Sequence, residues 1–368
     1  MRLPELTLGI EEEYQIIDPE SRELSPSGGL LLTEGEKVLG DQLKPEFLSS
    51  QIEVGTRVCG DLQEARAEVV RLRSEVSRLA QEQGLRMVAA STHPISSWSR
   101  QEVTDADRYQ RLEEDLKDVA RRLLIFGMHV HVGIDDPELR VDVMNQARYF
   151  IPHILALSTS SPFWAGRDTG LKSYRSVIFE NMPRSGIPPS FQAYTEYQGF
   201  IDTLIKTGCI DEPTKIWWDI RPHPKFPTLE FRVADVCTRI DEVMCIADLL
   251  QALVAKLVRL RRSNQRWRSY RHHLITENKW RAVRYGLDGK LIDFGKQEEV
   301  PLRHLALELL ELVDDVLDDL GARKDAEYLH TIVREGSSAD RQLATFRRTG
   351  DLKDVVDQLV SETQEGCD

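Results

Sequence analysis

Residues that bind metals and phosphates recur at two-residue spacing in segments rich in β-forming residues. Side chains two apart lie on the same face of a strand, because successive side chains point to opposite faces. The same-face pairs are Glu11 and Glu13 in GIEEEYQII, His129 and His131 in GMHVHVGI, and Glu230 and Arg232 in TLEFRVADV. A further glutamate, Glu53, lies in the short apolar segment SQIEVGT.

Together these residue types predict a phosphoryl-transfer site. Carboxylates are the oxygen donors that Mg²⁺ prefers, usually shared with substrate phosphates. An arginine on the same face would stabilise the charge on a transferring phosphoryl group. The chain contains neither G-x-x-x-x-G-K-[ST] nor G-x-G-x-x-G, so metals and arginines must hold the phosphates. Taken singly, the acids would also fit an exposed strand edge, and an H-x-H pair alone is weak evidence for a metal.

The elements expected to position these residues form an α+β fold, with 1–368 as a single catalytic domain. Asp61 is typical of a helix N-cap. The Gly/Pro-rich segment 161–190 and the segment 277–293 are expected to be loops, the first one lining the substrate site. We expect strands at 6–17, 50–56, 85–91, 127–134, 215–223 and 228–236, the last two antiparallel, and helices at 61–83, 105–124, 137–161, 191–206 and 241–262.

Composition narrows the class of protein further. The 368 residues carry a formal net charge of −13, which argues against a nucleic-acid partner because polyphosphate backbones select basic surfaces. No stretch approaches the length and apolar character of a membrane span, and a cytoplasmic protein without a membrane partner is expected. The arginine-rich run 259–273 indicates a solvated helix face or a lid over phosphates.

Several motifs, in order along nearly the whole chain, resemble the glutamate-cysteine ligase type 2 family of carboxylate-amine ligases, which are relatives of glutamine synthetase in fold. They are GIEEEYQIIDP, SSQIEVGT, GMHVHVGI, SPFWAGRDTG, YRSVIFENMPRSGIPP, LEFRVADV, ENKWRAVRYGLDG and GSSADRQ. The resemblance implies an open antiparallel sheet packed by helices. Its concave face would bind ATP, glutamate and two or three Mg²⁺ ions, for which Mn²⁺ could substitute.

The resemblance also implies roles for individual residues. Glu12 points to the opposite face and is expected in a structural ion pair. The implied metal ligands are Glu11, Glu13, Glu53, His129 and Glu230. The implied nucleotide-binding residues are His129, His131, Arg232 and Arg281, with Arg232 and Glu53 as catalytic residues. The implied substrate-binding residues are Arg167, Arg175, Asn181 and Arg284, and Asn278 and Trp280 would help to shape the site.

The function predicted from these observations is an ATP-dependent carboxylate-amine ligase. It would activate the γ-carboxylate of glutamate as an acyl phosphate and couple it to an amine such as that of cysteine. Two alternatives remain open, namely a Zn²⁺-dependent metallohydrolase that uses His129 and His131 and a non-catalytic sensor of nucleotides or amino acids on the same fold. The expected partners are small-molecule substrates, and a homodimer is left open.

Overall fold

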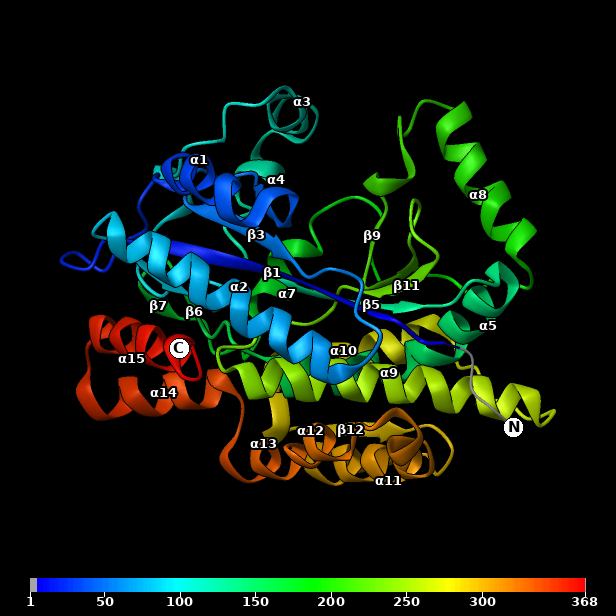
Figure 1. Ribbon diagram of the computed structural model, residues 1–368. Helices are drawn as coiled ribbons and strands as arrows, with labels where there is room; N and C mark the ends of the chain where they lie inside the picture. The colour runs from blue at the N-terminus through cyan, green and yellow to red at the C-terminus, as the bar shows by residue number, and fades with distance from the viewer. Residues whose placement is uncertain (1–4, 368) are drawn as a thin grey trace.

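A computed structural model describes residues 5–367, and its centre is an antiparallel sheet of seven strands (Figure 1). The strand order is β10-β11-β5-β1-β3-β2, and β4 also pairs with β1. The four strands expected to carry the site are therefore direct neighbours. The sheet strands are β1 (Leu8–Ile17), β2 (Leu43–Pro45), β3 (Gln51–Gly55), β4 (Arg86–Val88), β5 (Met128–Gly133), β10 (Ile220–Pro222) and β11 (Thr228–Phe231).

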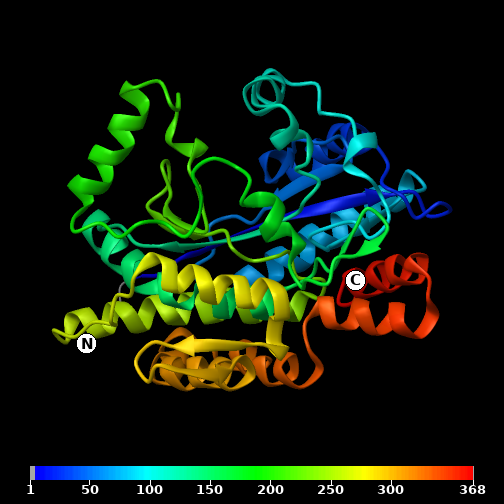
Figure 2. The same ribbon diagram turned by 180° about the vertical axis from the view of Figure 1, so that it is seen from behind.

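Helices surround this sheet, and the views from both sides show α11 to α13 as a layer beyond α9 and α10 (Figures 1 and 2). The helices are α1 (Gly28–Leu39), α2 (Leu62–Glu82), α3 (Asp107–Leu116), α4 (Asp118–Arg121), α5 (Pro137–Ala147), α6 (Ile151–Ser158), α7 (Tyr174–Phe179), α8 (Tyr194–Lys206), α9 (Ile240–Arg262), α10 (His272–Tyr285), α11 (Leu302–Leu320), α12 (Arg323–Glu327), α13 (Leu329–Glu335), α14 (Ser338–Thr349) and α15 (Leu352–Gln364). The smaller two-stranded pairings are β6 (Phe163–Trp164) with β7 (Arg167–Asp168), β8 (Ser185–Gly186) with β9 (Trp217–Trp218), and β12 (Lys290–Asp293) with β13 (Glu298–Pro301).

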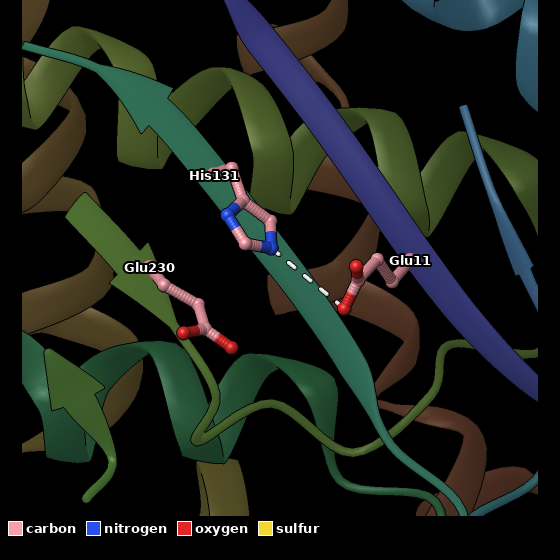
Figure 3. Close-up of side chains that lie close together, drawn as sticks. All are labelled: Glu11, His131 and Glu230. Carbon is pink, nitrogen blue, oxygen red and sulfur yellow. Dashed lines mark ion pairs between the residues drawn. The ribbon is translucent and has the colours of Figure 1, made fainter. Parts of the chain in front are cut away.

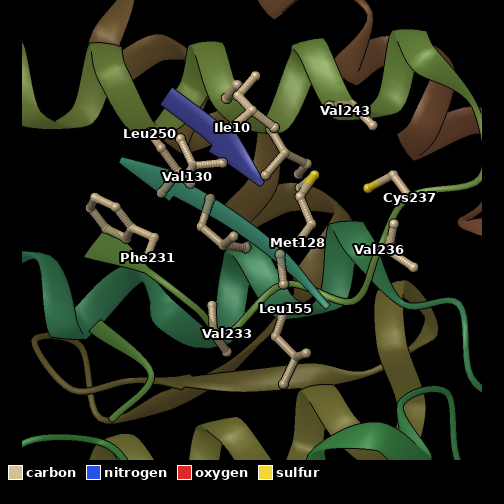
Figure 4. Packing of buried hydrophobic residues seen from close by; sticks show 14 of the residues in the cluster. Ile10, Met128, Val130, Leu155, Phe231, Val233, Val236, Cys237, Val243 and Leu250 are labelled. Carbon is tan, nitrogen blue, oxygen red and sulfur yellow. The ribbon is translucent and has the colours of Figure 1, made fainter. Parts of the chain in front are cut away.

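One face of the sheet is apolar and packs on helices α2 and α9. Ile10, Val130 and Phe231 lie on this face, and α9 meets it with side chains that include Leu250 (Figure 4). Residues that alternate with these along each strand must point to the other face. The apolar packing thereby directs the acids and imidazoles of β1, β5 and β11 to a common surface.

Glu12 confirms this alternation, because it lies on the apolar face in a buried ion pair with Arg73 of α2. The Arg73 Nε lies 3.2 Å from Glu12 Oε2, and the Tyr14 hydroxyl donates to the same oxygen over 2.7 Å. Arg73 also donates to the carbonyls of Cys237 at 2.8 Å and Thr238 at 2.6 Å. A buried charge pair persists when its remaining hydrogen-bonding groups are satisfied, as they are here. The pair fixes α2 beneath β1.

The predicted fold class is confirmed: helices pack an open antiparallel sheet in an α+β arrangement. Asp61 caps α2 by accepting from the Glu64 amide. The expected helix at 105–124 is broken at Lys117, whose φ is 49°. Within residues 5–367, no helix has both the length and the apolar character to cross a bilayer. The single domain over 1–368 stays a prediction.

The expected loops contain regular structure. Segment 161–190 includes the β6–β7 hairpin and helix α7. The prediction of a loop at 277–293 is wrong, because the first part of this segment lies in α10 and its end forms β12. Helix α10 buries the polar Asn278 and Lys279 beside Ile275 and Ala282, so its buried stripe does not show as an apolar period in the sequence. The arginine-rich run begins in the last turn of α9, where Arg259 pairs with Asp315 and Asp319 of α11, but residues 263–271 lie outside any helix.

A pH dependence of stability is expected from Asp248, which is fully buried in α9. Burial, reinforced by Asp325, raises the pKa of Asp248 from 3.8 to about 8. Between these values the folded chain holds a proton that the unfolded chain has lost, so stability falls as pH rises. Urea unfolding should show Asp248→Asn to be more stable than the wild type at pH 8 by on the order of 1 to 3 kcal/mol, with little difference at pH 4. An equal difference at both pH values would contradict this assignment.

Candidate active site

The register of the sheet brings the predicted site residues together in cross-strand pairs. Glu11 of β1 lies opposite His129 of β5. Glu13 lies opposite Glu53 of β3. On the other side of β5, His131 lies opposite Glu230 of β11. Directly opposed residues have Cβ atoms about 5 Å apart, so each pair shares one face and can act jointly.

The first group of candidate ligands consists of Glu11, His131 and Glu230, with one donor atom from each within 4.8 Å of the others. Figure 3 shows the three side chains converging from β1, β5 and β11. His131 Nε2 lies 3.7 Å from Glu11 Oε2, and His129 Nδ1 lies 3.1 Å from the same oxygen. Three neighbouring strands thus supply carboxylate and imidazole donors to one position.

The second group consists of Glu13, Glu46 and Glu53, which also offer one oxygen each within 4.8 Å of one another. Glu46 was missed by the sequence analysis. It lies in the short connection between β2 and β3, seven residues before Glu53, and no strand periodicity marks it. Only the reversal of the chain after Pro45 brings its carboxylate back over β3.

Crowding of like charges distinguishes this second group. Burial, together with neighbouring acids, raises the pKa of Glu13 to about 7 and raises those of Glu53 and Glu46 above their ordinary range. The Gly127 amide donates to Glu13 over 2.7 Å, and Lys44 reaches Glu53 at 3.0 Å with its ammonium. The carboxylates therefore lack full compensation within the described chain, and a bound cation would supply it.

His129 is suited to act as a neutral ligand, whereas the pKa of His131 is lowered by burial but raised above its ordinary value by the Glu11 and Glu230 carboxylates. Burial, followed by the charge of Arg232, lowers the pKa of His129 to about 4. Burial raises the pKa of Glu11, but the neighbouring imidazoles of His129 and His131 outweigh it and hold that pKa well below its ordinary value. The Nε2 atoms of both histidines are buried without a hydrogen-bond partner among residues 5–367. The grouped carboxylates are the donors that fit Mg²⁺ or Mn²⁺, and an unpartnered imidazole nitrogen beside them can add one further ligand.

Two arginines hold Glu230 at the edge of the first group. Arg221 of β10 lies opposite Glu230 in register and donates from Nε to its Oε2 over 2.6 Å. Arg232 donates to Glu230 Oε1. The Nε of Arg232 is buried and has no partner in the described part of the chain. Arg232 therefore keeps a donor available beside the carboxylates, whereas Arg221, which the sequence analysis missed, supports Glu230.

Arg175 is the one predicted substrate-binding residue that the structure brings to this face. It is buried on α7 and donates to the carbonyls of Val233 at 3.3 Å and Arg232 at 3.2 Å. A Cβ on Gly127 would lie 2.5 Å from its guanidinium, so this glycine makes room for it. The Nε of Arg175 has no partner in the described residues.

The other predicted residues make contacts elsewhere, and their binding roles stay predictions. Arg167 is exposed on β7. Asn181 donates back to the Val177 carbonyl at 2.8 Å. Arg281 pairs with Glu277 and Glu299, and Arg284 donates to the Gly170 carbonyl. Asn278 forms hydrogen bonds with the backbone of Ile292. Trp280 is 49% exposed.

A test of Glu46 follows from its place in the second group. We expect Glu46→Gln to raise the Mg²⁺ concentration for half-maximal turnover by roughly tenfold or more, because one charged donor is lost. Glu36→Gln, which changes an exposed glutamate of α1, is the matched control. An unchanged Mg²⁺ requirement in Glu46→Gln would remove Glu46 from the site. Turnover measured against Mg²⁺ at saturating substrates makes the comparison.

Solved structures share this architecture. A glutamate–cysteine ligase from Francisella tularensis, solved in complex with AMP, aligns with a TM-score of 0.73 at 14% identity over 100% of this chain and 90% of that one. A bifunctional glutathione synthetase from Pasteurella multocida aligns with a TM-score of 0.70 at 14% identity, over 98% of this chain and 52% of that one. The protein therefore has the fold of an open-sheet ligase.

Sequence relatives identify the family within this class. The chain belongs to glutamate-cysteine ligase family 2 (GCS2), whose model matches residues 7–358. Proteins named "Putative glutamate--cysteine ligase 2" are 57% identical in Roseiflexus sp. (strain RS-1) and 55% identical in Herpetosiphon aurantiacus, each over 98% of this chain and at least 94% of the relative. One from Solibacter usitatus is 51% identical over 99% of this chain and 94% of the relative. The chain is an ATP-dependent ligase.

Proposed function

We propose that this enzyme joins the γ-carboxylate of glutamate to an amine through an acyl phosphate, with cysteine as the first amine to test. The observation that carries the proposal is the pair of carboxylate groups on one sheet face beside Arg232. Such an arrangement suits a triphosphate, whose charge must be balanced before a second anion can approach it. The names of the relatives support the choice of substrates.

Within this proposal, the two groups of acids and the adjacent imidazoles hold the cations. Glu11, His131 and Glu230 would hold one Mg²⁺ ion, with His129 beside Glu11 as a further donor, and Glu13, Glu46 and Glu53 would hold another. When bound, these ions supply positive charge that balances the triphosphate and orients its γ-phosphoryl group. The chain itself contributes fixed positions, because all of these donors except Glu46 lie on paired strands.

The two arginines have different roles in this proposal. Arg232 donates to phosphoryl oxygens as charge moves during transfer, and Arg175 binds the substrate carboxylates from α7. One γ-carboxylate oxygen bonds to the γ-phosphorus while the bond to the bridging oxygen breaks and ADP leaves. The amine nitrogen then bonds to the activated carbonyl carbon and loses a proton, and phosphate departs with the carboxylate oxygen. Exclusion of water protects the acyl phosphate from hydrolysis.

The geometry favours this function over a zinc hydrolase. A hydrolytic zinc site has three protein ligands and an open position for water. Here His129 and His131 both contact Glu11, and the acids continue across β1 and β3 as the second group. That extension has no use in a mononuclear hydrolase, but it would supply a second cation position beside a triphosphate. A non-catalytic sensor would equally have no need for two adjacent cation positions.

The proposal is tested by measuring ADP release when glutamate or the amine is left out of the reaction. Purified protein with Mg²⁺ and ATP should release ADP only when both glutamate and a competent amine are present, and the amide product should match ADP in amount. ATP-independent hydrolysis with Zn²⁺ would favour the hydrolase. Binding of ATP without ADP release, across glutamate and a panel of amines, would favour the sensor.

A further inference from the structure

A buried lysine outside the predicted site connects the segments that carry Arg175 and Arg232. The side chain of Lys279, on α10, is 3% exposed. Its ammonium lies 2.7 and 2.9 Å from the two carboxylate oxygens of Asp219 and 2.8 Å from Glu180 Oε1. A buried ammonium is retained only when carboxylates compensate it. Asp219 is buried with Lys279, whereas Glu180 is 46% exposed and links the ammonium to the end of α7.

The two carboxylates come from different parts of the active-site framework. Glu180 is the C-cap residue of α7, the six-residue helix that carries Arg175. Asp219 lies between β9 and β10, and its carbonyl accepts the Arg232 amide at 2.8 Å. The Asp219 amide donates to the Gly186 carbonyl at 2.9 Å. Lys279 therefore connects α7 to the backbone next to Arg232 through side chains that contact neither candidate metal group directly.

Helix α7 depends on such external contacts. A helix of six residues has little stability of its own, because helix nucleation is costly and few intrahelical bonds follow. Its packing against α10 and the Lys279 bridge hold the end of α7. Arg175 reaches the sheet from this helix, and its guanidinium bonds to the Arg232 and Val233 carbonyls at 3.2 and 3.3 Å. A displacement of α7 would move Arg175 away from the substrate.

We infer that Lys279 is a positioning residue that clamps α7 to the β9–β10 junction and so fixes Arg175 relative to Arg232 for binding of the substrate carboxylate. The inference rests on the proposed function for the part that concerns substrate. The clamp itself is a property of the fold and can be measured without turnover.

The kinetic test compares Lys279→Met and Lys279→Arg with the wild type. In Lys279→Met, the KM for glutamate should rise on the order of tenfold while the KM for ATP changes less than about twofold, because Arg175 and not the cation groups is displaced. Lys279→Arg keeps the charge and should recover part of the loss. Lys256→Met is the matched control, because Lys256 of α9 pairs with Asp315 of α11 at 2.8 Å. It should leave both KM values unchanged.

The structural test uses hydrogen exchange of the backbone amides in the full chain. Lys279→Met should speed exchange in 174–181 while 194–206 in α8 keeps its wild-type rate. Faster exchange in 174–181 alone supports the clamp, whether or not the wild type is active with glutamate. A wild type that is inactive with glutamate would count against the proposed function and not against the clamp. Unchanged exchange in 174–181 would overturn the inference. Faster exchange throughout the chain, or equal losses for glutamate and ATP, would show a general role in stability and overturn it as well.

Discussion

Glu53→Gln is expected to lower kcat on the order of 10³-fold while the protein stays folded. Glutamine has almost the same shape as glutamate but offers one neutral oxygen in place of a charged carboxylate. Glu53 belongs to the second group with Glu13 and Glu46, so its loss weakens the cation position next to the triphosphate. Steady-state kinetics at saturating ATP, glutamate and amine measure the effect.

The fold should tolerate this change well. Burial and neighbouring acids raise the pKa of Glu53, which shows that its charge is unfavourable in the cation-free protein. Removing that charge should leave the free energy of unfolding unchanged or slightly higher. Glu298→Gln, on an exposed position of β13, is the matched control and should retain wild-type turnover. Near wild-type turnover in Glu53→Gln would remove this residue from the site.

Glu11→Gln and Glu230→Gln should also nearly abolish ligation, but they differ in their effect on stability. Glu230 is 1% exposed and neutralises both Arg221 and Arg232. Its replacement leaves two buried guanidinium groups poorly compensated, at a cost of about 3 to 5 kcal/mol. Glu11 is partly exposed and should show the loss of activity with little loss of stability. Thermal unfolding separates the two effects.

The second large effect is expected from Arg232→Ala, which should lower kcat by about 10³-fold or more, as when an arginine that stabilises phosphoryl transfer is lost. Its effect on ATP affinity should be smaller, because the cations carry most of the ground-state binding of the triphosphate. Arg232→Lys keeps the charge but loses the planar fork and should remain strongly impaired. Kinetic constants for ATP, combined with direct nucleotide binding, separate the two contributions.

Arg78→Lys provides a control for arginine replacement, because Arg78 pairs with Glu75 and Glu82 on the exposed face of α2. It should leave both constants unchanged. If Arg232→Ala weakened only the apparent affinity for ATP and kept kcat, the catalytic role of Arg232 would be wrong. Arg232 would then be a ground-state ligand of the nucleotide.

The placement of the strand residues was predictable because it follows from local periodicity. Two-residue spacing fixes the face of each side chain, and an apolar opposite face fixes which side is buried. Glu11, Glu13 and Glu230 therefore reached a common surface once their strands became neighbours. The register that pairs Glu13 with Glu53 required the three-dimensional structure, because it depends on how the strands align.

Residues outside the strands could not be placed in this way. Glu46 reaches the second group through a chain reversal that has no periodic signature. Lys279 has its partners 60 and 99 positions away in the sequence, so no local pattern marks it as part of the framework. For the same reason α10 was not predicted as a helix, because its buried stripe contains a lysine and an asparagine. Arg281 and Arg284 of the ENKWRAVRYGLDG motif bond to Glu299 and the Gly170 carbonyl, and their binding roles stay predictions.

The fate of one oxygen atom tests the central claim most directly. In an acyl-phosphate route, the γ-carboxylate oxygen that bonds to phosphorus leaves with the phosphate when the amine attacks. Glutamate labelled with ¹⁸O in its γ-carboxylate should therefore yield ¹⁸O-labelled phosphate during turnover with a competent amine, detected by mass spectrometry. An adenylating ligase would place the label in AMP and release pyrophosphate. Unlabelled phosphate formed in step with the amide would contradict the acyl-phosphate mechanism.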